Sequence, residues 1–348
     1  MKIAVYTIAK NEAQFVERWA HSARAADYLL IADTGSIDGT PMTARNLGVN
    51  VHSITVDPWR FDDARNTSLV LLPADIDMCI ALDMDEVLID GWREALEQLP
   101  ANITRPRYKY VWSWAGDGTE GLTYGGDKIH ARRGYRWRHP VHEVITPVIP
   151  EHQAWVDLQI HHHPDHSKSR SQYFPLLETA RAEAMHDDRT AFYYARELFF
   201  HQRLDEAAAE FERHLALPTA VWKPERAASM RYIAKCGVEP ERWFTLATLE
   251  APDRREPWVD LALWAYRQQD WTLVIRCCER ALTIVEQPLE YLCEPEAWGH
   301  TPHDLLAVAY YNTGNMTKAL DHAQQAVDLS PDDDRLTNNL SLIRTASE

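Results

Sequence analysis

Apolar positions in the first hundred residues follow two alternating spacings. Short β-branched runs lie at residues 3–8, 28–32, 51–56 and 78–82, and such runs are typical of buried strands. The intervening segments have helical spacing or helix-start signals, with a helical pattern over 12–26, an N-cap candidate at Asp38, and two acids opening the segment 62–72. Strands that alternate with helices predict a parallel sheet covered by helices, as in Rossmann-like nucleotide-binding folds.

Beyond residue 100 the pattern changes twice. Residues 105–160 contain aromatic, alternating stretches such as YKYVWSW, which predict hairpins. From about residue 169 the strand-like runs cease and helical spacing continues through the rest of the sequence. We therefore predict two domains, a sheet domain over 1–168 and an all-α domain over 169–348, which suits a length of 348 residues at about 150 residues per domain.

The helical half contains an internal repeat. Segments that begin AFYYARELFF, WVDLALWAYR and DLLAVAYYNT align without gaps in their cores, each with an aromatic-rich first helix, a turn and a second helix with small residues at set positions. The last copy resembles a tetratricopeptide repeat most closely, at Gly314, Ala319, Ala326 and Pro331. A plain helical bundle is the alternative, because regularly spaced small residues also occur in bundles.

Charge and composition narrow the choice of partners. The 36 Lys and Arg residues and 52 Asp and Glu residues give a net charge of −16, which disfavours general binding of polyanions. No secretory signal is evident, and Asp75 and Asp77 interrupt the longest apolar stretch, so we expect a soluble, cytoplasmic protein without a membrane segment. Five cysteines without a Cys-x-x-Cys pair indicate neither a disulfide framework nor a zinc knuckle.

Two aspartates follow the fourth predicted strand. Asp83 and Asp85, in ALDMDEV, stand at the carboxyl end of that strand, where open α/β sheets bind their ligands. Two carboxylates in this position can hold Mn²⁺ or Mg²⁺, which neutralises the oxygens of a diphosphate. The spacing alone is weak, because this composition gives about eight acid-x-acid pairs by chance. A solvated charge cluster is the alternative interpretation.

Four motifs in order resemble family 2 glycosyltransferases of the GT-A fold: IAKNEAQFVERW, IADTGSIDGT, DDARNTSL and ALDMDE. The resemblance covers about residues 1–166. It implies a nucleotide-sugar domain in which Asp33 contacts the uracil, Arg65 lies beside the nucleotide, and Asp83 and Asp85 bind the ribose and the metal, with Asp83 nearer the ribose. The remaining residues that fall where the family lines the nucleotide pocket are Thr7, Lys10, Asn11 and Glu12.

The most similar subgroup is a cytosolic type with C-terminal tetratricopeptide repeats, which includes the sublancin-type peptide S-glycosyltransferases. Its Val-His-Glu motif is matched at residues 141–143. We expect His142 to complete the metal shell, since neutral imidazole is a good ligand, although a strand histidine held by backbone hydrogen bonds is the alternative. Glu143 is the favoured catalytic base. Adjacent strand residues face opposite sides, so His142 and Glu143 share one site only if the backbone bends, which Pro140 favours.

A second candidate for the catalytic base is Asp127, in the sequence YGGDK. The flanking glycines, Gly125 and Gly126, would allow a substrate to approach closely. The acid-Asp motif that many family 2 enzymes carry further along the chain is absent from this sequence. The choice between Glu143 and Asp127 therefore stays open, with Glu143 ahead.

The run HHHPDH gives four histidines, His161, His162, His163 and His166. On a strand, His161 and His163 would share a face and could contribute to a second metal shell or, when protonated, contact a phosphate. Packing of a loop at the domain junction is the alternative that we favour.

Residues 105–138 stand apart in an acidic chain, with eight basic residues against three acids and seven aromatic residues between them. Aromatic rings stack on sugars or bases, and arginines pair with phosphates. The stretch could grip the donor diphosphate and sugar, with Trp137 among the substrate-binding residues. It could instead receive a phosphate-bearing acceptor such as a nucleic acid, or form an ordinary hairpin surface.

These observations predict an inverting, metal-dependent glycosyltransferase that moves a hexose from a UDP-sugar to a peptide, protein or other macromolecular acceptor, using Mn²⁺ or Mg²⁺. Inversion follows from the family resemblance. The repeats would offer a groove for the acceptor or a surface for a homodimer. The alternatives are transfer to a hydroxylated base in DNA and a non-catalytic scaffold that binds partners through its repeats.

Overall fold

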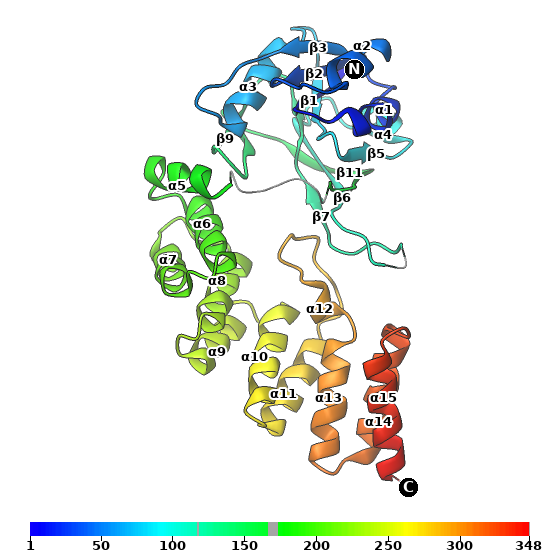
Figure 1. The fold of residues 1–348 in the computed structure, drawn as a ribbon, viewed down its shortest axis with the longest axis vertical. Helices are drawn as coiled ribbons and strands as arrows, with labels where there is room; N and C mark the ends of the chain where they lie inside the picture. The colour runs from blue at the N-terminus through cyan, green and yellow to red at the C-terminus, as the bar shows by residue number, and fades with distance from the viewer. Residues whose placement is uncertain (117, 166–172, 348) are drawn as a thin grey trace. The chain divides into compact units, whose positions relative to one another are not determined.

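The chain forms two compact units, Met1–Glu183 and Ala184–Glu348. The structure is a computed structural model that describes residues 1–116, 118–165 and 173–347. The first unit is a mixed α/β domain with a mostly parallel sheet, and the second is an all-helical, tetratricopeptide-like repeat domain (Figure 1). The predicted fold class is confirmed at this level.

The two units divide later than residue 168, the boundary expected from the sequence pattern. Helix α5 (Tyr173–Glu183) belongs with the sheet unit. The ring of Tyr173 lies edge-on to Phe61 at 6.0 Å between centroids, and Glu183 accepts a hydrogen bond from Arg60 at 2.5 Å. The loss of strand patterning near residue 169 therefore does not coincide with the change from one packed unit to the next.

The main sheet has the order β3-β2-β1-β4-β8, in which the first four strands are parallel and β8 is antiparallel to β4. The four parallel strands lie close to the predicted runs. Side chains of β1 alternate, so that Ile3 and Val5 join the core on one face while Ala4 and Tyr6 join the core on the other. The strands of this sheet and the helices between them are β1 (Ile3–Ala9), α1 (Ala13–Ser22), β2 (Tyr28–Asp33), α2 (Thr40–Asn46), β3 (Asn50–Ser53), α3 (Phe61–Leu71), β4 (Met78–Ala81) and β8 (Ile129–Ala131).

A second sheet, ordered β5-β11-β6-β7, and a two-stranded ribbon of β9 and β10 complete the first unit. The predicted hairpin-rich stretch is thus built of strands, and β6 pairs antiparallel with β7. Strand β11 is parallel to β6 and antiparallel to β5, which sets His162 opposite Glu86. The further elements are β5 (Glu86–Leu88), α4 (Trp92–Glu97), β6 (Arg105–Val111), β7 (Thr123–Gly126), β9 (Tyr135–Arg138), β10 (Val144–Pro147) and β11 (Gln153–His162).

The second unit packs its helices in successive antiparallel pairs, α6 with α7, α8 with α9, α10 with α11 and α13 with α14, followed by α15 (Figure 1). The repeat alignment sets Ala207, Val274 and Ala319 at the same position of three second helices, and all three are fully buried. No helix among the described residues is long and apolar enough to cross a membrane. The helices are α6 (Asp188–Phe200), α7 (Leu204–Ala216), α8 (Lys223–Lys235), α9 (Pro240–Glu250), α10 (Arg255–Arg267), α11 (Trp271–Leu282), α12 (Pro295–Trp298), α13 (Thr301–Asn312), α14 (Met316–Leu329) and α15 (Asp334–Ser347).

Candidate active site

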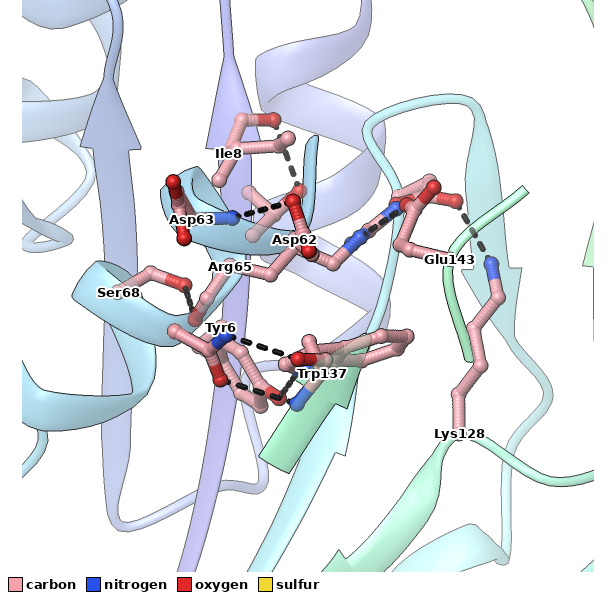
Figure 2. Close-up of polar contacts among 12 residues, drawn as sticks. Tyr6, Ile8, Asp62, Asp63, Arg65, Ser68, Lys128, Trp137 and Glu143 are labelled. Carbon is pink, nitrogen blue, oxygen red and sulfur yellow. Dashed lines mark hydrogen bonds and ion pairs between the residues drawn. The ribbon is translucent and has the colours of Figure 1, made fainter. Parts of the chain in front are cut away.

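A cluster of charged side chains forms beyond the carboxyl end of β4. Asp83 follows that strand, Arg65 comes from α3, and Glu143 precedes β10. Arg65 donates through Nη2 to Oδ1 of Asp83 at 2.7 Å and through Nε to Oε1 of Glu143 at 2.5 Å. Figure 2 shows Arg65 extending toward Glu143 from its helix. The fold therefore brings three of the predicted site residues together at the edge where α/β sheets bind ligands.

A second cation reaches the same aspartate. The Lys128 ammonium, from the turn between β7 and β8, lies 2.7 Å from Oδ2 of Asp83 and 2.7 Å from Oε1 of Glu86. Glu86 also accepts from the Tyr110 hydroxyl at 2.6 Å and from the Asp83 backbone N–H at 2.8 Å. These bonds fix the turn that follows β4, so the Asp83 carboxylate is held between Arg65 and Lys128.

Burial and charge act in opposite directions on the carboxyl groups of this cluster. Burial alone would raise the pKa of Asp83, but the Arg65 and Lys128 cations outweigh it and hold that pKa well below the ordinary value. For Glu86 burial prevails over Lys128, and the pKa is raised. Burial would lower the pKa of Lys128, but Asp83 and Glu86 raise it well above the ordinary value. Asp83 is therefore ionised and Lys128 protonated at neutral pH.

Arg65 lies on a buried aromatic support. Its Cζ is 4.9 Å from the centroid of Trp137, and the Asn66 side chain exchanges two 2.9 Å hydrogen bonds with the Trp137 backbone. The indole N–H of Trp137 donates to the Tyr6 hydroxyl at 2.8 Å (Figure 2). Trp137 is only 2% exposed, so it supports Arg65 from below and does not offer an open face for a sugar.

The support continues to His130, which is fully buried. Its Nδ1 lies 2.8 Å from the Ala131 carbonyl oxygen and its Nε2 lies 3.0 Å from the Tyr6 hydroxyl. A carbonyl oxygen only accepts, so Nδ1 carries the proton and Nε2 accepts from Tyr6. Burial lowers the pKa of His130 to about 4, and the ring is neutral near pH 7.

The third guanidinium nitrogen of Arg65 takes no part in the contacts with Asp83 and Glu143. Nη1 is buried without a hydrogen bond within the described part of the chain. The side chain is 6% exposed, and buried donors are paired in most native structures. This unpaired donor belongs to a guanidinium that shares the partly exposed Asp83 carboxylate with the Lys128 ammonium. It is therefore a position where an anionic ligand oxygen would fit.

Asp85 meets a histidine that the metal prediction did not choose. Its Oδ2 lies 3.4 Å from Nε2 of His162, whose Nδ1 is 2.9 Å from the Trp112 carbonyl oxygen. The carbonyl requires a proton on Nδ1, so a neutral His162 turns the Nε2 lone pair toward a carboxylate. That contact is favourable only when the ring is protonated or a cation is shared. Burial lowers the pKa of His162, but Asp85 and the Trp112 carbonyl raise it overall.

The oxygen and nitrogen of this pair also fit a metal ion. Two ligand atoms that each lie about 2.1 Å from one ion are separated by about 3.0–3.5 Å, and a backbone carbonyl bonded to the other ring nitrogen is a common outer partner of a ligating histidine. Within the described residues no group of three or more His, Cys, Asp or Glu side chains is arranged as a metal site. Asp85 and His162 are thus two side chains whose spacing would suit one ion.

His142 lies elsewhere. The backbone does bend, with positive φ at His139 and at His142, and Glu143 reaches Arg65. The His142 ring instead packs edge-on against Tyr173, at 5.6 Å between centroids. The structure therefore favours His162 over His142 as the histidine beside Asp85.

The first two motifs build the loops after β1 and β2. The carboxylate of Asp33 accepts from the N–H groups of Gly35 and Ser36 at 3.2–3.3 Å, and Oδ1 of Asn11 accepts from Ile37 at 2.8 Å. The Asp33 bonds order the loop after β2, and the Asn11 bond ties that loop to the one after β1 at the carboxyl edge of the sheet. The three other residues predicted to line the nucleotide pocket have different surroundings. Lys10 is exposed. Glu12 is buried and donates its backbone N–H to the Thr40 hydroxyl, and Thr7 is fully buried and donates its hydroxyl to the Ile8 carbonyl.

Asp127, the rival base, lies apart from the Arg65 contacts. Its carboxylate pairs with Nη2 of Arg105 at 3.0 Å, whereas the neighbouring Lys128 points to Asp83. The expected close approach of a substrate to Gly126 is wrong, because the Tyr108 ring already occupies that space. A Cβ at residue 126 would lie 2.3 Å from Cε2 of Tyr108.

The histidine run divides between two faces of the chain at the end of β11, with His163 directly after the strand. His161 and His163 share one face, as predicted, and both contact Trp114, at 4.9 Å edge-on and 5.8 Å stacked. His162 points the other way, toward Asp85 and Trp112. His166 lies outside the described residues. The run therefore contributes packing on one face and a candidate ligand on the other.

The aromatic residues of 105–138 are mostly internal. Tyr108, Tyr110, Tyr135 and Trp137 are buried, whereas Arg136 and Arg138 alternate with them on β9 and are exposed. Arg105 is itself buried and paired with acids. The alternation of a half-buried ribbon explains the pattern, and the buried rings are not available to stack on bases.

Sequence reasoning missed Lys128, Glu86 and Tyr110 and undervalued His162. The sequence pattern indicated Asp127 and not its neighbour Lys128, because which of the two reaches the site depends on the side of the turn that each side chain faces. Glu86 was the third acid of DMDE. Neither position has a spacing signal, since their partners lie far apart in the sequence.

Comparison with known proteins adds information on the repeats alone. No known family model matches the chain, and no curated protein matches it. Among solved structures, yeast Tom70 is similar at 14% identity with a TM-score of 0.39, over 52% of this chain and 37% of that one. The tetratricopeptide protein YrrB also has 14% identity and a TM-score of 0.39, over 49% and 83%. A thermophilic tetratricopeptide protein of Thermus thermophilus, TTC0263, has 14% identity and a TM-score of 0.34, over 49% and 89%.

Proposed function

We propose that the sheet unit is an inverting, metal-dependent glycosyltransferase that transfers a hexose from a UDP-sugar to a peptide or protein acceptor. The observation that carries this proposal is the cluster at the carboxyl edge of the parallel sheet, where Arg65 and Lys128 hold Asp83 and where Nη1 of Arg65 is unpaired. Two fixed cations beside the ionised Asp83 suit a diphosphate and its counter-ion. The family 2 resemblance of the four sequence motifs supports the same assignment.

The chain's own residues would divide the work as follows. Asp85 and His162 would hold Mn²⁺ or Mg²⁺, which supplies charge neutralisation for a departing diphosphate. Arg65 and Lys128 would bind diphosphate oxygens directly. Positive groups that are already oriented stabilise the negative charge that develops as the bond from the sugar to the diphosphate breaks.

Glu143 is the favoured base. Its Oε1 accepts from Arg65, whereas no residue in the described part of the chain donates to Oε2. Oε2 would take the proton from the acceptor hydroxyl, thiol or amide as the acceptor atom bonds to the anomeric carbon. Attack from the face opposite to the diphosphate inverts the configuration. Asp127 is less well supported because its carboxylate pairs with Arg105 and not with Arg65, the residue that joins Glu143 to Asp83.

The first experiment measures UDP release from a panel of UDP-hexoses with Mn²⁺, Mg²⁺ or a chelator. We expect metal-dependent release with the wild-type chain and at least a hundredfold loss in Asp85→Asn. Asp75→Asn is the matched control, because Asp75 is an aspartate with a 64% exposed side chain that pairs with Lys2. Glu143→Gln should lose turnover while it retains UDP binding.

Thermal shift with UDP and Mn²⁺ provides a binding readout that does not depend on the acceptor. A specific ligand stabilises the folded state by about 2.7 kcal/mol at a hundred times its Kd. If neither UDP nor any UDP-hexose shifts the transition in the presence of metal, and no metal-dependent release occurs, the non-catalytic scaffold is the better interpretation.

A further inference from the structure

A connecting segment in the helical unit folds across the first helices of neighbouring repeats. Residues 284–294, here called the resident segment, link α11 to α12, whereas the other repeat connections are short turns. Its side chains contact residues of α6 and α8 and the residue before α10. Aligned helices of a solenoid form an extended surface that binds other chains. The resident segment lies on such a surface.

An aromatic anchor holds the middle of the segment. The Tyr291 ring stacks on Tyr193 of α6, with centroids 6.3 Å apart and planes inclined by 15°, and lies 5.7 Å from the Trp222 ring. Its hydroxyl donates to Oε2 of Glu225 on α8 at 2.7 Å. The slot thus recognises both the ring and the hydroxyl of a tyrosine.

Two carboxylates flank this anchor and meet two arginines. Glu290 accepts from Nε and Nη2 of Arg254 at 3.2 and 3.0 Å, which is a bidentate pair. Glu294 accepts from Nη2 of Arg231 at 2.7 Å. The Arg231 side chain is 5% exposed and also pairs with Asp260 at 2.6 Å. Arg254 also pairs with its neighbour Asp253 at 2.6 Å. Each arginine therefore binds one carboxylate of the repeats and one carboxylate of the resident segment.

The segment fits its place closely. The space left between it and α8 and α10 is a cavity of about 10 Å³, lined by residues that include Arg231, Arg254 and Cys293. That volume is about enough for one water molecule. The Cys293 side chain is buried and donates to the Pro288 carbonyl at 3.1 Å, so the segment is ordered partly by its own contacts.

We propose that this surface is a peptide-binding groove, and that the resident segment is an internal substitute for an acidic, tyrosine-containing peptide segment of a partner protein. The groove offers two arginines for carboxylates and an aromatic slot with an acceptor, Glu225, for a phenol. A partner with the same arrangement of Glu and Tyr side chains would replace the segment contact by contact. The inference does not depend on transferase activity.

The tether makes the resident segment a strong competitor. A short flexible connection gives an effective concentration of about millimolar, so a free peptide with the same contacts binds the wild-type chain weakly. Removing the tyrosine anchor from the resident segment should free the groove for a peptide that still carries it. Because the recognition is ionic at both ends, added salt should weaken that binding.

The test uses a fluorescein-labelled synthetic peptide of residues 284–296, IVEQPLEYLCEPE, kept reduced, and anisotropy with the full-length chain. Tyr291→Ala should bind this peptide at least tenfold more tightly than the wild-type chain does. Adding Arg254→Glu to that variant should weaken binding at least tenfold. Arg242→Glu is the matched control, because Arg242 is a 60% exposed arginine of α9 that pairs with Glu239, and it should leave binding unchanged.

A peptide with glutamine in place of its glutamates tests the acidic requirement and should not bind. Circular dichroism establishes that each variant is folded, and Glu290→Gln replaces Tyr291→Ala if the latter is not. Equal affinity of the wild-type and opened chains for the acidic peptide would overturn the proposal. Binding that survives Arg254→Glu, or that is as tight for the neutral peptide, would also overturn it.

Discussion

Replacing Arg65 by methionine tests whether the charge cluster is held together through this guanidinium. Arg65 is 6% exposed and pairs with Asp83 and Glu143, whose side chains are 29% and 11% exposed. The methionine keeps most of the apolar contact with Trp137 but removes the charge. Both carboxylates would then stay in the interior without their shared cation.

The structure gives the size of the expected loss. Removing one partner of a buried ion pair destabilises a protein by about 3–5 kcal/mol. Asp83 is partly open to solvent and keeps Lys128 as a partner, so we expect about 2–4 kcal/mol for the sheet unit. Arg65 lowers the pKa of Asp83 in the folded state, so their pairing adds to the free energy of unfolding. This stabilisation is fully present above the ordinary aspartate pKa of about 4, and it is lost as the pH falls through the lower pKa of the folded state. The difference between wild type and variant should therefore shrink in acid.

Hydrogen exchange measured by mass spectrometry reports the sheet unit separately from the repeats. For amides of β1 and β4 that exchange by unfolding of this unit, 2–4 kcal/mol corresponds to about a 30- to 900-fold faster exchange. Arg93→Met is the matched control. Arg93 also pairs with two carboxylates, but Asp27 and Glu97 are 38% and 44% exposed, and exposed pairs contribute about 0–1 kcal/mol.

The reasoning fails if Arg65→Met leaves exchange in β1 and β4 unchanged. It also fails if Arg93→Met accelerates exchange as much, because burial would then not decide the effect. If the stability difference between wild type and Arg65→Met stays constant from pH 7 to pH 3, the destabilisation comes from lost packing on Trp137 and not from the carboxylates.

Two further predictions concern the interior of the sheet unit. Burial lowers the pKa of His130 to about 4, so as the pH falls from about 6.5 to 4 the unfolded chain takes up a proton that the folded chain does not. The free energy of unfolding, measured by urea denaturation, should therefore fall by up to about 3 kcal/mol over that interval. His130→Gln should flatten this pH dependence, and an unchanged pH dependence would contradict the assignment. Gly126→Ala should destabilise the same unit by about 1–3 kcal/mol, because its methyl would overlap Tyr108; Gly116→Ala, where a Cβ meets nothing within 4 Å, is the control, and equal melting temperatures of the two variants would refute the clash.

Local pattern was enough to predict the elements of the main sheet. Three of the four parallel strands, β1, β2 and β4, are short and largely buried runs, and burial on both faces leaves an apolar signature that does not depend on distant residues. Strand β3 is exposed or half-buried at every position, and its β-branched residues indicated it instead. The repeat alignment likewise identified Ala207, Val274 and Ala319, which are fully buried, because each repeat packs only on its neighbours.

The site was predicted less completely, since its contacts join distant segments. The edge of the sheet that holds Asp83 followed from topology, and Arg65 and Glu143 followed from family resemblance. The choice between His142 and His162 depended on how β11 pairs with β5, which sets His162 opposite Glu86. Adjacent residues of a strand or turn face opposite sides, so a shift of one residue exchanges Asp127 for Lys128.

The double hydrogen bond between the Asn66 amide and the Trp137 main chain imitates one rung of a β-ladder, formed by a helix side chain. Two bonds of opposite polarity define an orientation as well as a distance. These two uncharged hydrogen bonds fix helix α3, which carries Arg65, against strand β9, which leads to Glu143. The alignment of the two residues therefore does not depend on their ion pair alone. A ligand anion that draws Arg65 away from Glu143 would change the charge balance of the cluster while the backbone around it stays in place.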